Sequence, residues 1–176
     1  MIDLPSVWQL ALALHGCSCP ALAVGTRAVA YALEKFDLPV AAAPYPIVCT
    51  AESFSCSIDA IQAILGCTIG NGKLRIQNRK RMAFRFCHTV TQRSVYLQLI
   101  AQLRADSTTA EEILTLPVHD LFSIHILSEI PNRPPNSFLS TACPLRSPEP
   151  AITRPPAPQR EIREIIAPLP GYDRDW

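Results

Sequence analysis

Proline sets the first limit on how this chain folds, because most of its 17 prolines lie after residue 130. The stretches PNRPPNS (131–137) and CPLRSPEPAITRPPAPQ (143–159) are too rich in proline for a regular helix or sheet, since proline lacks a backbone N–H and restricts φ. We therefore expect a folded domain over residues 1–130 and an irregular, Pro-rich C-terminal extension over residues 131–176.

Hydrophobic periodicity within the first 130 residues predicts an α+β fold, in which helices pack on an antiparallel sheet. The predicted helices span residues 5–14, 20–36, 57–65 and 109–115. The predicted strands span residues 47–52, 73–77, 82–89, 94–100 and 123–129. The second, third and fourth strands follow one another through short turns, which predicts a three-stranded antiparallel meander.

Local signals mark several helix boundaries. Pro20 suits the first position of its helix, and Gly66 is a plausible C-terminal stop. Thr108 followed by Glu111 predicts a capping box for the helix at residues 109–115. A glycine in the middle of a helix costs about 1 kcal/mol relative to alanine. Gly25 is therefore interpreted as a position of close packing.

Cysteines precede two of the predicted helices. Cys19 lies directly before the helix at residues 20–36, and Cys56 directly before the helix at residues 57–65. Helix N-termini carry unpaired N–H groups and the positive end of the helix dipole, which favour a thiolate nucleophile or metal ligand. We expect the two helix starts to face each other across one site.

His15, Cys17 and Cys19 are spaced by two, so in an extended segment they would point to one side. With Cys56 they form a predicted ligand set of one nitrogen and three sulfurs, which suits zinc or another soft transition metal. Asp59, one turn into its helix, could orient a ligand or accept a proton, and Cys56 and Asp59 are the candidate catalytic residues. An open metal position would make the site catalytic, and four protein ligands would make it structural.

The remaining cysteines and histidines have simpler interpretations. We expect the cysteines in apolar surroundings to pack in the core; they are Cys49, Cys67 and Cys87. We expect the other histidines on strand and loop surfaces; they are His88, His119 and His125. The run from Gly70 to Lys73 could cradle a phosphate, but it lacks the P-loop spacing, and a turn entering a strand is favoured.

The net charge of +1 argues against nucleic acid or a membrane surface as a partner. No apolar run reaches the ~18 residues of a membrane span. The N-terminus has no basic residue before its apolar stretch, so we expect no secretory signal. A cytoplasmic location follows as the expectation, and in a reducing compartment cysteine clusters are more often metal-binding or catalytic than disulfide-bonded.

Four blocks together resemble the core domain of the formylmethanofuran dehydrogenase E-subunit family. The blocks are HGCSCPALAVGTRA, SCSIDAIQAILGCTIGNGKL, KRMAFRF and ILTLPVHDLF, within about residues 10–130. The resemblance implies an α+β core paired into a homodimer, with a metal or active site around His15, Cys19 and Cys56. It also matches Asp59 and Gln62 to a polar pair of the family.

The chain departs from the family pattern in three ways. The family usually has a histidine at the position of Cys17 and a glycine at the position of Ala21. Many members also carry a C-terminal zinc finger with paired cysteines, whereas this chain has only Cys143 in its Pro-rich extension. A site richer in sulfur could prefer another metal or work by thiol chemistry.

These observations favour a metal-binding protein related to the oxidoreductases of one-carbon metabolism, acting as an enzyme subunit or accessory. Its partners would be a second copy of the chain, an enzyme complex and a small-molecule substrate of unknown identity. Two alternatives stay open from the sequence. One is a non-catalytic metal or sulfur carrier, and the other is a structural dimer in which the site staples two helix ends.

Overall fold

Residues 2–40, 44–104 and 107–127 are described by a computed structural model. The predicted domain boundary at residue 130 and the Pro-rich extension of residues 131–176 lie outside the described residues. Within these ranges, no helix has both the length and the apolar character needed to cross a membrane.

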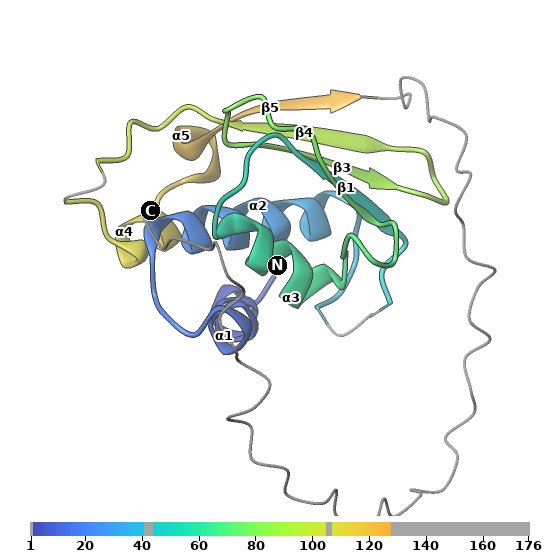
Figure 1. The fold of residues 1–176 in the computed structure, drawn as a ribbon. Helices are drawn as coiled ribbons and strands as arrows, with labels where there is room; N and C mark the ends of the chain where they lie inside the picture. Colours follow the sequence, from blue (N-terminus) through green and yellow to red (C-terminus); the bar gives the residue numbers. More distant parts are fainter. Residues whose placement is uncertain (1, 41–43, 105–106, 128–176) are drawn as a thin grey trace, which may run out of the picture. The chain divides into compact units, whose positions relative to one another are not determined.

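Helices and strands alternate along the described chain, as an α+β fold requires (Figure 1). The helices are α1 (Leu4–His15), α2 (Pro20–Lys35), α3 (Ser57–Leu65), α4 (Ala110–Thr115) and α5 (Val118–Leu121). The strands are β1 (Ile47–Ala51), β2 (Leu74–Ile76), β3 (Ala83–His88), β4 (Ser94–Leu99) and β5 (Phe122–Leu127). The predicted elements are thus confirmed in type and order.

The strands form one five-stranded sheet in the order β2-β1-β3-β4-β5, which confirms the predicted fold class. The predicted meander was wrong at its first strand. β2 pairs in parallel with β1, with Cys49 opposite Leu74, and β3 lies antiparallel on the other edge of β1. Parallel neighbours need a crossover connection, and α3 supplies it between β1 and β2. Periodicity identifies a strand but not its partner, so the sequence pattern missed this pairing.

The core lies between the sheet and the helices on one of its faces (Figure 1). One face of the sheet contributes buried side chains from neighbouring strands; these include Cys49, Phe86, Val95, Phe84 and Leu97. α2 is buried along most of its length and contacts α1, α3 and α4. It is therefore the central helix around which the others are placed.

Most of the local boundary signals are confirmed. Pro20 occupies the first turn of α2, and Gly66 ends α3 with a left-handed φ of 64°. The capping box is present but shifted by one residue, to Thr109 and Glu112. Thr108 is engaged elsewhere, because its Oγ1 accepts a hydrogen bond of 2.9 Å from the N–H of Arg104.

The predicted core cysteines are confirmed, since Cys49, Cys67 and Cys87 are all buried. His119 and His125 are exposed, as predicted. The surface prediction for His88 was wrong: its ring is buried and meets the ring of Phe36 edge-on, with centroids 5.5 Å apart.

Gly25 is a close-packing position, as its place in mid-helix indicated. A Cβ at this residue would lie 2.5 Å from the carbonyl oxygen and 2.6 Å from the Cα of Ser57. Both are backbone atoms in the first turn of α3, so a rotamer change could not relieve the overlap. The glycine allows the start of α3 to lie directly against α2.

We predict that Gly25→Ala lowers the free energy of unfolding by about 1–3 kcal/mol, as overpacking of a filled interior does. Gly70→Ala is the control, because only one atom lies within 4 Å of the added Cβ, at 3.9 Å. It should shift stability by less than about 0.5 kcal/mol. Chemical denaturation measures both variants. Stabilisation by Gly25→Ala, as expected for an uncrowded helix, would contradict the close approach of α2 and α3.

Candidate metal centre

Three helix ends converge on one group of potential ligands. His15 is the last residue of α1, which ends where Gly16 adopts a left-handed φ of 85°. Cys19 is the N-cap of α2, and Cys56 directly precedes α3. The short link of residues 16–19 joins α1 to α2, and the contact at Gly25 holds α3 against α2. The three side chains therefore come from segments whose positions are set by helix packing.

His15, Cys19 and Cys56 each offer a ligand atom, and these atoms all lie within 4.8 Å of one another. The Cys19 Sγ lies 3.6 Å from the His15 Nε2. All three residues are partly buried. The structure thus brings together three of the four predicted ligands, from both predicted helix starts.

Cys17 lies outside this group and is exposed. The predicted alternation needed an extended segment from residue 15 to residue 19. His15 instead belongs to helix α1, and the left-handed Gly16 then turns the chain. Spacing by two places side chains on one side only in extended backbone, and this condition is not met here.

Asp59 orients the histidine. Its Oδ2 lies 2.7 Å from the His15 Nδ1, and its Oδ1 accepts a hydrogen bond of 3.3 Å from the Gln62 Nε2. A proton on Nδ1 that is donated to this carboxylate leaves the Nε2 lone pair directed at the two sulfurs. Carboxylates commonly orient metal-binding histidines in this way. The arrangement matches the orienting role predicted for Asp59.

The two cysteines differ in their relation to their helices. The Cys19 Sγ accepts a hydrogen bond of 3.4 Å from the Leu22 N–H and so caps α2, as its position predicted. Cys56 has helical backbone angles and makes no capping bond with its side chain. Burial, followed by the neighbouring Cys19 thiol, raises the pKa of the Cys56 thiol. Its position before a helix therefore does not by itself create a reactive thiolate.

Sequence reasoning did not single out the buried Glu52, which links β1 to the loop before β3. Its carboxylate accepts hydrogen bonds of 3.2 Å from Arg79 and 2.7 Å from Arg81. The predicted basic run is therefore partly neutralised inside the fold. No local pattern signals this pairing, because Glu52 is more than 25 residues away from both arginines along the chain.

The model of the family described as "FmdE, Molybdenum formylmethanofuran dehydrogenase operon" matches residues 14–123, which is more than half of the chain. The chain belongs to the FmdE family. The match covers His15, Cys19, Cys56 and Asp59, so the whole candidate centre lies in the family domain.

The FmdE-family fold is also found in a crystal structure. This chain is similar to an FmdE-like protein of tungsten formylmethanofuran dehydrogenase from Syntrophus aciditrophicus, with 19% identity and a TM-score of 0.53. The similarity covers 73% of each chain. A comparison with curated proteins found no match. At this identity, the likeness supports the fold.

Cysteine reactivity in this FmdE-family chain should follow burial. Burial raises the pKa of Cys67 to about 11 and the pKa of Cys49 well above its usual range. At pH 8 a thiol with a pKa near 11 is only about 0.1% thiolate, the reactive form. We predict that iodoacetamide modifies the exposed Cys17 in the native protein while Cys49 and Cys67 stay unmodified.

Peptide mass spectrometry assigns the modification at each position. The same reaction in denaturant is the control, and there all cysteines should be modified. Native-state labelling of Cys67 as fast as that of Cys17 would contradict the burial of Cys67.

Proposed function

We propose that this FmdE-family protein binds one soft transition metal ion, with zinc as the first candidate, through His15, Cys19 and Cys56. The ligand atoms would be the histidine Nε2 and the two sulfurs. The observation that carries the proposal is the convergence of these three atoms within 4.8 Å of one another, from three different helix ends.

The distances support a tetrahedral ion. Zinc bonds of about 2.3 Å to sulfur and about 2.0 Å to nitrogen separate two tetrahedral ligands by about 3.5 Å. The Cys19 Sγ and the His15 Nε2 are 3.6 Å apart, which fits this separation. One nitrogen and two sulfurs are also a donor set that zinc proteins use with a fourth position open.

Such a metal would supply Lewis-acid polarisation of a substrate or activation of water at the open position. The protein's own residues would prepare that position. Asp59 holds His15 in one tautomer, and Gln62 holds Asp59 in turn. Cys56 and Cys19 would give up their protons on binding, so the site carries no thiol hydrogen toward the substrate. Asp59 is then a positioning residue, and Cys56 a ligand.

We place this activity in one-carbon or redox metabolism, as an oxidoreductase-related subunit or accessory that works as a homodimer in the cytoplasm. The family membership supports the metabolic setting. The cysteines of the described ranges are free rather than disulfide-bonded, which suits a reducing compartment.

A metal carrier is the second candidate, and the exposed Cys17 favours it. A thiol two residues from Cys19 could receive the metal during transfer to a partner. The two functions differ in how readily the metal leaves. A catalytic centre would hold its ion against a competing chelator, whereas a carrier would release it within the assay.

We predict that protein purified without added metal carries about one metal ion per chain. Cys56→Ala should lose the ion, because only two donors remain, while its folded mass by light scattering stays that of the proposed dimer. Cys17→Ala is the matched control and should keep the ion. Elemental analysis decides between them. Loss of the metal in Cys17→Ala would favour the structural four-ligand site, and metal-free wild-type protein would refute the proposal.

We also predict that Asp59→Asn weakens zinc affinity by about 10- to 100-fold, the usual effect of losing an orienting carboxylate. The asparagine amide can donate to the His15 Nδ1, which places the ring proton on Nε2, the ligand atom. Competition with a chromophoric chelator measures the affinity. Glu111→Gln, an exposed carboxylate on α4, is the control. Equal losses in both variants would remove the specific role of Asp59.

A further inference from the structure

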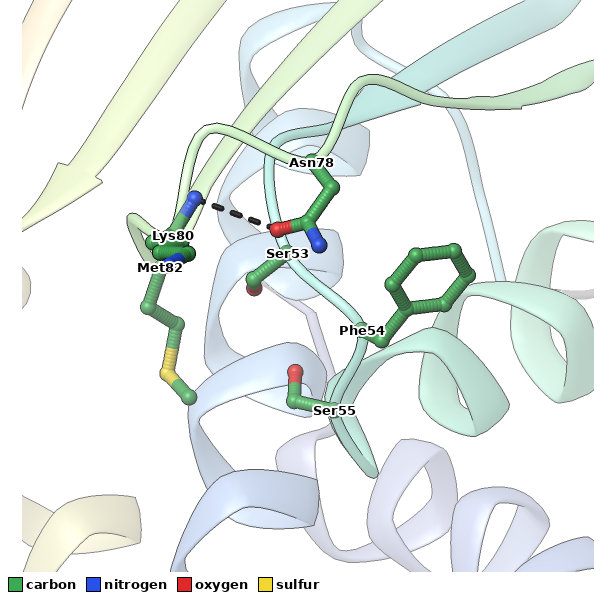
Figure 2. A pocket seen from close by; sticks show the side chains of 6 residues that line it. All are labelled: Ser53, Phe54, Ser55, Asn78, Lys80 and Met82. Atoms are coloured by element: carbon green, nitrogen blue, oxygen red, sulfur yellow. Dashed lines mark hydrogen bonds between the residues drawn. The ribbon is translucent and has the colours of Figure 1, made fainter.

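A pocket of about 390 Å³ lies beside the candidate metal centre (Figure 2). Its lining comprises Ser53, Phe54, Ser55, Asn78, Lys80 and Met82. The first three residues form the segment that runs directly into Cys56. Because adjacent Cα atoms are about 3.8 Å apart, the wall at Ser55 adjoins the backbone of a proposed metal ligand. A pocket of this size suits a small molecule.

Glu52 fixes the second wall of the pocket. Its side chain is only 6% exposed and pairs with Arg79 and Arg81, while its backbone carbonyl accepts a hydrogen bond of 2.8 Å from the Arg79 N–H. The Tyr96 hydroxyl also donates to this carboxylate, at 3.4 Å. The loop is thus tied to the end of β1 by both side-chain and backbone bonds, so the pocket is preformed.

The other residues of this loop line the pocket. Asn78, Lys80 and Met82 alternate with the two paired arginines, and all three contribute to the lining. Lys80 has a left-handed φ of 56°, which is uncommon for a residue with a side chain. Its N–H donates to the Asn78 Oδ1 at 3.2 Å, as the dashed line in Figure 2 marks.

The interior of the pocket contains a hydroxyl without a partner. The Ser53 Oγ is buried, and no described residue offers it a hydrogen bond. Buried polar atoms are seldom left unsatisfied, so this atom calls for a ligand or water. Figure 2 shows the Ser53 and Ser55 hydroxyls between Met82 on one side and Phe54 on the other.

We propose that this pocket is the substrate subsite of the metal centre and that it binds a small organic anion with a flat apolar body. Lys80 forms no ion pair with a described residue, and two arginines share the single charge of Glu52, so the loop is net positive. The Asn78 amide and the Ser53 hydroxyl supply hydrogen bonds to anionic oxygens. The ring of Phe54, which is 69% exposed, and the Met82 thioether supply apolar contact.

The subsite rests on the proposed metal function for its role, but its binding chemistry does not need the metal. Carboxylates and phosphates would both satisfy a lysine and these hydrogen-bond donors. Benzoate and phenyl phosphate are therefore the two anionic probes. Benzamide is the uncharged probe, because it has nearly the same shape as benzoate and no charge.

Each probe is titrated into isotope-labelled protein, and amide chemical shifts are followed by NMR. We expect at least one anion to bind at millimolar concentration and to shift the resonances of Ser53 and Asn78, with benzamide binding more weakly. Lys80→Gln should weaken the anion by about five-fold or more, since a charge-assisted contact is lost. The stronger of the two anions identifies the charged group that the site prefers.

Lys35→Gln is the matched control. The backbone carbonyl of Lys35 accepts a bond from Arg93, at the end of β3 far along the strand from Met82, so this variant should bind like the wild type. Ser53→Ala is a second variant, which should weaken binding without changing any charge.

Three results would overturn the subsite: no binding of either anion, equal affinity in Lys80→Gln and wild type, or binding that disappears in Cys56→Ala while Lys80→Gln is unaffected. The last result would mean that the anion binds only a metal ion. Metal content measured on the same samples keeps the two proposals separate. Protein that carries metal but binds no anion refutes the subsite alone, and protein that binds the anion without metal refutes the metal centre alone.

Discussion

The close approach of α3 to α2 at Gly25 is the contact on which the rest of the structure depends. With no Cβ at this position, the backbone of Ser57 can lie against the helix, where an added carbon would be only 2.5 Å from it. Cys56 is the residue before Ser57, so the same contact brings its sulfur toward Cys19. α3 also forms the crossover between the parallel strands β1 and β2. One glycine thus links the helix packing, the sheet topology and the candidate site.

Polar contacts complete the centre that helix packing begins. His15 would be an unoriented side chain at the end of α1 without Asp59, whose carboxylate reaches it across 44 residues of sequence. Gln62 supports Asp59 from the next turn of α3. The histidine nitrogen therefore faces two sulfurs in a fixed orientation, which is the chemical reason for proposing a metal there. The adjoining pocket adds cationic and hydroxyl groups, and together they outline a reaction site.

Sequence reasoning found the elements and most of the site because both depend on local patterns. Apolar periodicity, Pro20 and Gly66 placed α2 and α3, and cysteines at helix starts indicated Cys19 and Cys56. The reasoning failed where distant residues decide. It assigned β2 to a meander, although the strand pairs with β1, and it grouped Cys17 with His15, although the end of α1 turns the chain between them. It also missed the pairing of Glu52 with two arginines.

The sequence by itself determined the α+β class, the family and the identity of the sulfur and nitrogen donors, because these depend on residue types and their spacing. Only the tertiary structure decided which donors meet, that Asp59 orients His15, and that a pocket adjoins them. Those features come from contacts between segments tens of residues apart. Local patterns cannot specify such contacts, because their geometry depends on how all the helices and strands pack at once.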